Sequence, residues 1–317
     1  MLSVFMDLKQ TALILEGGGM RGAYTAGVLR WFMDRNLYLS YVIGTSIGAC
    51  NGANYVARQP ERNRIVNIHY VRDSRFLSYR RFLFRGELFG MKFIFDTFPH
   101  DLVPFDFQTF KQSEQRFILP CFDCKAGETV YYDKNELDEA GFLAVLQAGS
   151  SLPILQKPVF FQGRVLLDGG IADSLPIQKS IADGNQRHVV ILTKPRGYLK
   201  KPSKFAWLVR KWYPEYKGLA RGVAERHTRY NETMQWIDRL EDEGKVFVIR
   251  PDRPLIVNRV NRNSHKLYTV YNQGYSEAQA CFDRLRAYLE TDSAPALKIT
   301  PNSKESGNGR INTPKNH

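Results

Sequence analysis

Short apolar runs along the first half of the chain are each followed by glycines and then by a stretch with helical periodicity. The hydrophobic pattern predicts strands at residues 11–16 and 39–43, and helices at 23–35 and 47–57. A strand, a tight turn and a helix that repeat in this order are typical of a parallel sheet with helices packed on it. Both glycine turns then lie at the carboxyl edge of the sheet, where open α/β sheets bind ligands.

The same alternation continues downstream. It predicts further strands at 117–122, 129–132, 158–162, 164–168, 189–192 and 246–249, and further helices at 61–70, 137–148, 230–242 and 276–289. We expect a three-layer α/β/α fold with a mostly parallel central sheet over residues 11–195. Residues 196–290 are expected to form a basic, aromatic extension and a smaller C-terminal α/β appendage. Residues 291–317 are expected to be a disordered tail, because Ser, Asn, Lys and Pro dominate there.

The second glycine turn reads Gly44-Thr45-Ser46-Ile47-Gly48 and has the Gly-x-Ser-x-Gly spacing of a nucleophile elbow. Glycines flank the serine in such a turn because a Cβ there would clash with the sharply bent backbone. The serine is then exposed in a strained position at the start of a helix. The alternative interpretation is a tight turn whose serine only caps the helix.

The first glycine turn allows two interpretations. A Gly-x-Gly-x-x-Gly turn between a strand and a helix is the fingerprint of dinucleotide binding. Glycine N–H groups at a helix N-terminus can equally form an oxyanion hole, which stabilises a negatively charged oxygen. An arginine in the turn adds a positive charge beside the glycines. The turn consists of Gly17, Gly18, Gly19, Met20, Arg21 and Gly22.

Three motifs follow one another along the chain: Glu16 with the first glycine turn, the second glycine turn, and Asp168-Gly169-Gly170 far downstream. Together they resemble the patatin-like phospholipases, of the bacterial type. The resemblance rests on three motifs in the same order and covers about residues 11–195. It implies a serine lipid acyl hydrolase in which Ser46 is the nucleophile, Asp168 is the base, and no histidine, metal or cofactor takes part. Plant patatins carry Asp where this chain has Glu16, and some members carry Ala at Gly170.

The resemblance also implies a substrate and a mechanism. We expect a phospholipid or another ester lipid, cleaved in the manner of a phospholipase A or a carboxylesterase. The first glycine turn would form the oxyanion hole. Gly44, Thr45, Ile47 and Gly48 would shape the elbow around Ser46.

Composition and charge favour a lipid surface as partner. The 317 residues are 43% hydrophobic and 24% charged, as in globular proteins, but the net charge is +13 and the isoelectric point is about 9.5. Such a charge favours an anionic surface, either a membrane or a nucleic acid. The sequence contains no recognised nucleic-acid module, so we expect no nucleic-acid partner.

Two segments, 72–98 and 194–229, mix cationic with aromatic residues, a composition typical of the headgroup boundary of a membrane. The same aromatic residues could instead belong to the core, to a lid or to a domain connector. Residues 1–10 lack the basic start and the apolar run of a secretory signal, and no run of about 18 apolar residues occurs. We expect a cytoplasmic protein that could also bind membranes peripherally.

The four cysteines do not predict a disulfide scaffold. Cys121 and Cys124 form a C-x-x-C pair at the end of a predicted strand, but no second pair completes a zinc site. Packing is therefore favoured over metal or redox chemistry for this pair.

Three alternatives to a Ser–Asp hydrolase stay open. A nucleotide-binding protein would need an acidic residue about 20 positions after the glycines, at the tip of the second strand; Asp34 is near that spacing but within the predicted helix. A lipid-surface adaptor would keep the fold without catalysis. A Ser–Asp–His triad could use His188, His227 or His265, but only about two strands precede Ser46, too few for an α/β-hydrolase.

Overall fold

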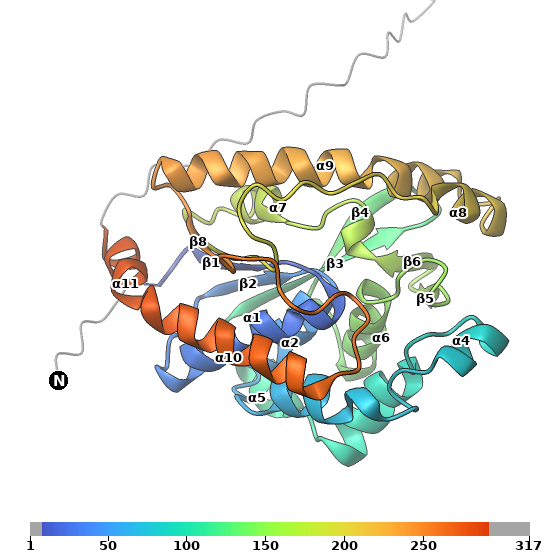
Figure 1. The fold of residues 1–317 in the computed structure, drawn as a ribbon, viewed down its shortest axis with the longest axis horizontal. Coiled ribbons are helices and arrows are strands. Elements are labelled where there is room, and N and C mark those ends of the chain that lie inside the picture. The colour runs from blue at the N-terminus through green and yellow to red at the C-terminus, as the bar shows by residue number, and fades with distance from the viewer. Residues whose placement is uncertain (1–7, 292–317) are drawn as a thin grey trace, which may run out of the picture.

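The computed structural model describes residues 8–291. Its described part contains one sheet of eight strands in the order β5-β6-β3-β2-β1-β7-β8, and β4 also pairs with β3 (Figure 1). The strands are β1 (Thr11–Leu15), β2 (Tyr41–Gly44), β3 (Arg116–Asp123), β4 (Glu128–Asp133), β5 (Val159–Phe161), β6 (Arg164–Asp168), β7 (Arg187–Ile191) and β8 (Phe247–Ile249). Most of the predicted tail at 291–317, and most of the stretch 1–10 tested for a signal peptide, lie outside the described residues.

The centre of the sheet is parallel. β1 lies between β2 and β7 and runs parallel to both, so that Leu13 is opposite Val42 on one side and Val189 on the other. β2 and β3 are also parallel, as are β7 and β8, whereas the pairs among β3, β4, β5 and β6 are antiparallel. The predicted α/β class with a mostly parallel central sheet is confirmed.

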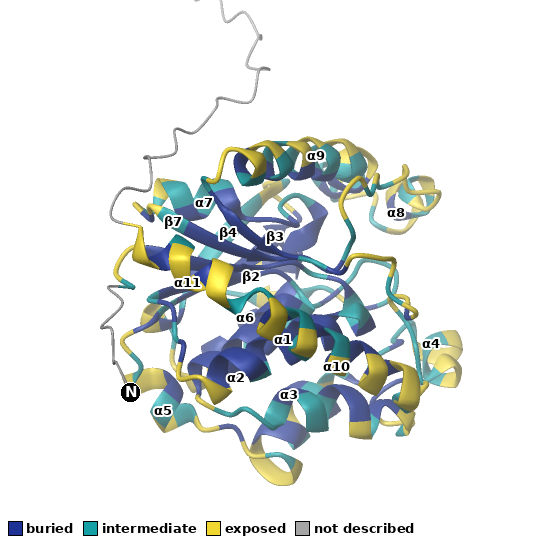
Figure 2. Ribbon diagram, turned by 60° about the vertical axis from the view of Figure 1, so that its left-hand side comes forward, coloured by how far each residue is buried: buried dark blue, intermediate teal, exposed yellow. Residues whose placement is uncertain are grey.

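Helices cover both faces of the sheet, and its central strands are almost entirely buried, whereas β4 and β5 are partly exposed (Figures 1 and 2). One face carries α1 (Gly22–Asp34), α2 (Ile47–Val56) and α6 (Glu139–Gly149), and the other carries α7 (Ile177–Ala182) and α9 (Lys217–Asp242). The remaining α-helices are α3 (Arg62–Arg64), α4 (Tyr79–Arg85), α5 (Phe107–Gln112), α8 (Ala206–Trp212), α10 (Ser264–Ala280) and α11 (Phe282–Glu290).

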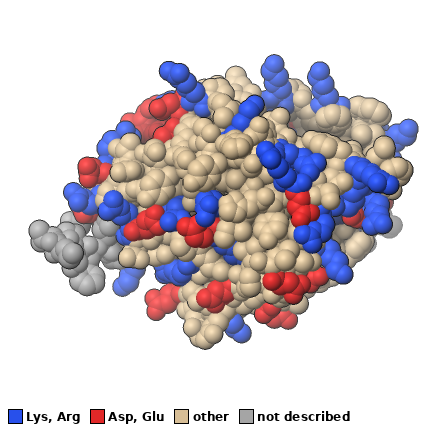
Figure 3. Space-filling model, turned by 60° about the horizontal axis from the view of Figure 1, so that its bottom comes forward, with Lys and Arg blue, Asp and Glu red and all other residues tan. Residues whose placement is uncertain are grey.

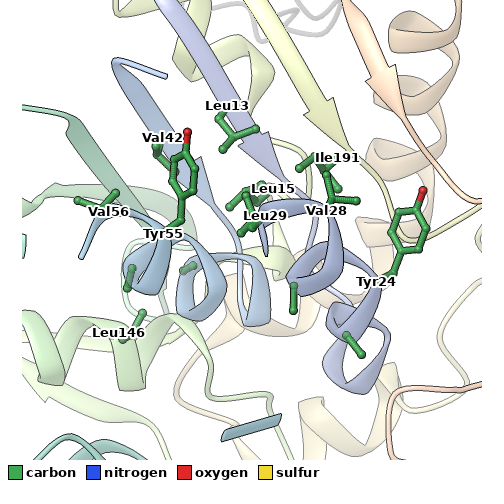
Figure 4. Close-up of a cluster of buried hydrophobic side chains, with 14 of the residues drawn as sticks. Leu13, Leu15, Tyr24, Val28, Leu29, Val42, Tyr55, Val56, Leu146 and Ile191 are labelled. Atoms are coloured by element: carbon green, nitrogen blue, oxygen red, sulfur yellow. The ribbon is translucent and has the colours of Figure 1, made fainter. Parts of the chain in front are cut away.

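Alternate residues of β1 belong to two different cores. Leu13 and Leu15 pack with Leu29 of α1 in the cluster drawn in Figure 4. Ile14 points the other way and packs in a second cluster with Met234 of α9. Because both faces are covered, the strand reads as a continuous apolar run rather than as an alternating one.

α1 and α10 cross at two glycines. A Cβ on Gly27 would lie 1.9 Å from the carbonyl oxygen of Tyr271, and a Cβ on Gly274 would lie 2.1 Å from that of Tyr24. Each glycine therefore receives the backbone of the other helix. This contact attaches α10 to the α1 layer although more than 200 residues separate the two helices in the chain.

Helices beyond residue 195 differ from those predicted. α9 begins at Lys217 rather than at 230, because Leu219 and Val223 in its first half are buried against the sheet. Instead of one helix at 276–289, α10 and α11 meet at Cys281. β8 extends the main sheet by pairing with β7, and the division of the chain into units at residue 195 stays a prediction.

The basic–aromatic segment 72–98 is partly buried in the core and partly exposed at the surface. Phe76, Phe93 and Phe98 are buried in the main core, whereas Leu83 and Phe84 of α4 are exposed. Part of this segment, from Phe93 on, is π-helical, as are residues 65–69, which were predicted as regular helix. Among residues 8–291, no helix combines the length and the hydrophobicity that crossing a bilayer requires.

Candidate active site

Ser46 stands on a sharp turn between β2 and α2. Its backbone has φ 57° and ψ −127°, a conformation that residues with a Cβ rarely adopt. A Cβ on Gly44 would lie 2.6 Å from the Gly48 carbonyl oxygen, and a Cβ on Gly48 would lie 2.5 Å from the Leu15 carbonyl oxygen. The two flanking glycines are thus required by close backbone approach, as expected for an elbow.

Asp168 is the last residue of β6, and its neighbours hold it in place. The carboxylate Oδ1 accepts a hydrogen bond of 2.8 Å from the N–H of Gly170. A Cβ on Gly169 would lie 2.3 Å from the carbonyl oxygen of Pro120 in β3, so the Asp-Gly-Gly turn fits directly against the neighbouring strand. The side chain is almost fully buried, with 1% of its surface exposed.

The structure brings Ser46 and Asp168 together. Burial raises the pKa of Asp168, while Arg226, the Ser46 hydroxyl, the Gly170 N–H and Arg259 each act to lower it. Oδ2 of Asp168 is buried and has no well-aligned hydrogen-bond partner among the described residues. A catalytic serine–carboxylate contact is often long without substrate and tightens when substrate binds.

The first glycine turn lies directly against Ser46. A Cβ on Gly17 would be 3.1 Å from the Cβ of Ser46. The N–H groups of Gly17 and Gly18 donate no hydrogen bond within the described residues, whereas the N–H of Met20 donates to the carbonyl of Arg259 at 3.1 Å. Gly19 has φ +58° and begins a short 3₁₀ turn, where the first N–H groups lack helical partners.

These elements surround one cavity of about 580 Å³. It lies beyond the carboxyl end of β1, between β2 and β7, where the chain order of the strands reverses and α/β sheets bind ligands. The cavity is lined by Glu16, Gly17, Gly18, Gly19, Arg21, Thr45, Ser46, Tyr79, Leu152, Asp168, Ser174, Lys194, Tyr198, Lys200, Arg226, Tyr230, Asn258, Arg259 and Val260.

Glu16, which precedes the glycines, is a buried structural acceptor. One carboxylate oxygen accepts from the backbone N–H of Thr193 at 2.5 Å and from its hydroxyl at 3.0 Å. The other accepts from the hydroxyl of Tyr230 at 2.7 Å. The glutamate thereby connects the end of β1 to the segment after β7 and to α9, which fixes the base of the glycine turn.

The three histidines considered for a Ser–Asp–His triad do not lie beside Ser46 in the cavity. His188 lies in β7, where burial lowers its pKa to about 4 and its Nδ1 faces the Ser180 hydroxyl. His227 faces the carbonyl of Ala224 on α9, and His265 is on α10. Within the described part of the chain, no histidine lines the cavity.

Two further predicted features take no part in the cavity. Asp34, the acidic residue considered for nucleotide binding, ends α1 and pairs with Arg30 and Tyr275. Cys121 and Cys124 are buried, and burial raises the pKa of both thiols. No group of three or more His, Cys, Asp or Glu side chains suited to a metal ion occurs within residues 8–291.

The sequence did not predict that residues beyond 195 line the cavity. Lys200, Arg226, Tyr230 and Arg259 all line it, but no motif marks them. The sequence marks Lys200 and Arg226 only as members of the basic–aromatic segment 194–229. Their position follows from the path of α9 across the sheet, which local sequence patterns do not show.

Comparison with known families gives a match over half of the chain. Residues 13–180 match the family model of the patatin-like phospholipases. The chain belongs to the patatin-like phospholipase family. A second family model, for a domain of unknown function (DUF6363), matches residues 216–290, which include α9, β8, α10 and α11.

Relatives of this patatin-like protein are identical to it at a quarter or slightly more of the aligned positions. The uncharacterized protein YjjU of Escherichia coli strain K12 is 28% identical over 252 residues, which are 77% of this chain and 69% of YjjU. Lysophospholipase nte1 of Aspergillus terreus is 26% identical over 219 residues, which are 65% of this chain and 14% of that protein. The chain thus matches only a small part of the fungal lysophospholipases.

A solved structure also matches, at a greater distance. VipD from Legionella pneumophila aligns with 86% of this chain and 67% of its own chain, at 11% identity and a TM-score of 0.43. This likeness is too low to support an argument about function. The family match and the mixed α/β sheet are consistent with each other, and at family level they support lipid acyl hydrolase chemistry.

Proposed function

We propose that this protein is a serine lipid acyl hydrolase with Ser46 as nucleophile and Asp168 as base. The observation that carries the proposal is the strained backbone of Ser46, which stands beside a buried carboxylate and beside glycine N–H groups in one cavity. Strained residues cluster at functional sites, because the surrounding structure must hold them in place.

In the proposed reaction, Ser46 Oγ attacks the carbonyl carbon of the ester, and its proton moves to Asp168. Negative charge develops on the carbonyl oxygen, to which the N–H groups of Gly18 and Gly19 donate. When the carbon–oxygen bond to the alcohol breaks, the alcohol takes the proton from Asp168. Water then attacks the acyl-serine, again giving its proton to Asp168, and the fatty acid leaves as Ser46 recovers its hydrogen.

The environment of Asp168 suits a base. A carboxylate of ordinary pKa is a weak acceptor for a serine proton, and burial raises the pKa of this one. Arg226 and Arg259 act in the opposite direction and keep the ionised form available. Met20 is left out of the proposed oxyanion hole, because its N–H is already hydrogen-bonded to Arg259.

The dyad is tested by measuring ester turnover of Ser46→Ala, Asp168→Asn and the double variant on a short-chain ester. We expect each single change to reduce kcat by about 10³-fold or more, and the double change to add little, because members of one catalytic unit act non-additively. His227→Gln is the control and keeps its activity. A folded Ser46→Ala protein with near wild-type turnover would refute the proposal.

We also propose that the protein binds anionic membranes through α4 and α8. The two helices lie at the same end of the molecule (Figures 1 and 2), where Lys and Arg side chains also gather (Figure 3). Large apolar side chains are exposed on both: Leu83 of α4 is 79% exposed and Trp207 of α8 is 65% exposed. Tyr79 of α4 also lines the cavity, so a membrane bound there would meet the active site.

Flotation with vesicles tests this surface. Binding is expected to grow with the fraction of anionic lipid and to weaken with salt. Replacing both Leu83 and Trp207 with Ser should weaken binding at least about fivefold, since two side chains lose roughly 1 kcal/mol or more of apolar burial. Tyr268→Ser on α10 is the control for an exposed aromatic residue elsewhere. Equal binding by all three proteins would exclude this surface.

A further inference from the structure

Five cationic side chains line the cavity beside Ser46: Arg21, Lys194, Lys200, Arg226 and Arg259. Only two acidic side chains face them. Glu16 has its oxygens engaged by Thr193 and Tyr230, and Asp168 is the proposed base. With five positive and two negative groups, the cavity carries a formal excess of three positive charges.

Glu16 and Asp168 act on these cations only from beyond salt-bridge distance. Within residues 8–291, the side chains of these five residues make no salt bridge, although seventeen salt bridges occur elsewhere. The Nε atoms of Arg21 and Arg226 are buried and lack a hydrogen-bond partner there, as do those of four arginines elsewhere. Those four donate from other guanidinium nitrogens, whereas the side chains of Arg21 and Arg226 donate no hydrogen bond within residues 8–291. Buried donors are normally satisfied in a native protein, so unpaired guanidinium groups around a cavity indicate that an anion completes them.

Burial and mutual repulsion affect the charges of this cluster. Burial lowers the pKa of Arg226 to about 10, and Arg259 and Arg21 contribute to that lowering. Burial lowers the pKa of Lys200 as well; Arg226, Arg259 and Arg21 act in the same direction, and Glu16 acts against them. Like charges held this close destabilise one another unless an anion lies between them.

Lysine side chains cover two of the three tyrosine rings that line the cavity, those of Tyr198 and Tyr230, and leave the ring of Tyr79 on α4 open. Lys194 Nζ lies 4.3 Å from the ring centroid of Tyr198, and Lys200 Nζ lies 3.4 Å from that of Tyr230. A quaternary ammonium group such as choline is usually recognised by open aromatic faces. Here lysine ammonium groups cover the faces of Tyr198 and Tyr230, so a zwitterionic headgroup that binds among the cations meets repulsion on its own ammonium group.

We propose that this cluster binds the phosphate of an anionic lipid headgroup that carries no ammonium group, and so makes phosphate-monoester lysolipids the preferred substrates of Ser46. The inference rests on the proposed hydrolase function and names its substrate class. A phosphate monoester brings close to two negative charges, which the excess of three cations can neutralise, and its oxygens are good acceptors for arginine and lysine. Tyr79 and Leu152 offer an apolar part of the same cavity for the acyl chain.

The test compares three monomeric substrates with the same short acyl chain: a lysophosphatidate, a lysophosphatidylcholine and a monoacylglycerol. For the wild-type protein, kcat/KM for the lysophosphatidate should exceed that for each of the other two at least about tenfold, which corresponds to about 1.4 kcal/mol. In Lys200→Gln and in Arg259→Gln, the loss for the lysophosphatidate should exceed the loss for the monoacylglycerol at least about tenfold.

Lys201→Gln is the matched control, because it removes one positive charge from an exposed neighbour of Lys200 that does not line the cavity. If the monoacylglycerol and the other two esters are all left uncleaved, the proposed function itself fails. If esters are cleaved but the wild type shows no preference for the lysophosphatidate, or if Lys201→Gln lowers that preference as much as Lys200→Gln does, the headgroup site is wrong.

Binding to Ser46→Ala, measured by calorimetry, separates the headgroup from free phosphate. Glycerol 3-phosphate should bind, and Lys200→Gln or Arg259→Gln in the same background should weaken it about tenfold or more. Arg259 is exposed, so its substitution gives a result even if the variant at Lys200 does not fold. Inorganic phosphate binding as tightly as glycerol 3-phosphate, without a preference for the lysophosphatidate, would overturn the assignment to a lipid headgroup.

Discussion

Replacing Ser46 with glycine should leave the protein more stable than replacing it with alanine, while either change abolishes catalysis. Ser46 holds φ 57° and ψ −127°, in a region that glycine enters without a penalty and other residues enter only under strain. The surrounding contacts force this geometry, because Gly44 and Gly48 already bring the backbone of the turn to its closest approach. Glycine at position 46 keeps the turn and removes the strained Cβ.

The size of the effect follows from two opposing terms. A residue with a Cβ in a sparsely populated backbone region costs about 1–3 kcal/mol. Glycine loses more backbone freedom on folding, which costs roughly 0.5–1 kcal/mol relative to alanine. The expected net gain of Ser46→Gly over Ser46→Ala is therefore about 0.5–2 kcal/mol, or roughly 1–3 °C in Tm for a chain of this size.

Thermal unfolding of the two variants measures this difference, because both lack the hydroxyl and only one retains the Cβ. Ser113 supplies the matched control: it has φ −60° and ψ 129°, which any residue adopts, and it is only partly exposed at the end of α5. There the glycine variant should be less stable than the alanine variant. If Ser46→Gly is no more stable than Ser46→Ala, the elbow is not strained and the main structural support for a nucleophile is lost.

Two other predictions concern the base and the helix crossing. Arg226→Met should shift the acidic limb of the kcat/KM profile on a neutral ester to higher pH, because Arg226 lowers the pKa of Asp168 and the base must be ionised; an unchanged or lower limb would contradict it. Gly274→Ala should destabilise the fold by about 1–3 kcal/mol in urea unfolding, since its Cβ would lie 2.1 Å from the Tyr24 carbonyl oxygen. Alanine normally stabilises a helix relative to glycine, so any gain in stability would refute the close crossing.

The sheet and the turns around the proposed dyad could be predicted because their signals are local. Each glycine turn follows a continuous apolar run, and the spacing of glycines around Ser46 reflects a backbone approach that the structure shows directly. Asp168 ends β6 in the Asp-Gly-Gly turn, but β6 runs antiparallel to β3, so the rule for parallel strands does not place it. It reaches the turns after β1 and β2 because β3 extends beyond β2 and Asp168 pairs with Cys121 near the end of β3. Local sequence was sufficient wherever local backbone geometry decides the position.

The rest depends on packing between distant segments. The first half of α9 is too polar to show a clear apolar stripe, yet Leu219 and Val223 bury it against the sheet. The cationic cluster draws residues from positions 21 to 259, and no spacing rule connects them. The hydrogen bond from the Met20 N–H to the Arg259 carbonyl, which removes this N–H from the proposed oxyanion hole, likewise joins residues far apart in the chain. Such features follow from the assembled fold and not from any stretch of sequence.

The C-terminal region is part of the candidate active site rather than an addition to it. The glycine turn that would form the oxyanion hole is held from both ends by residues of the region matched to the second family model: Tyr230 donates to Glu16 before the glycines, and Arg259 accepts from Met20 after them. A Cβ on Gly19 would lie 2.5 Å from the Arg259 carbonyl oxygen, so the turn and residue 259 fit closely. In the proposed mechanism, residues 13–180 supply the nucleophile and the base, whereas residues 216–290 fix the geometry in which the glycine N–H groups face the substrate. Arg259 also belongs to the cationic cluster, and Tyr230 lines the same cavity, so positioning of the oxyanion hole and recognition of the headgroup would depend on one set of contacts between the two regions.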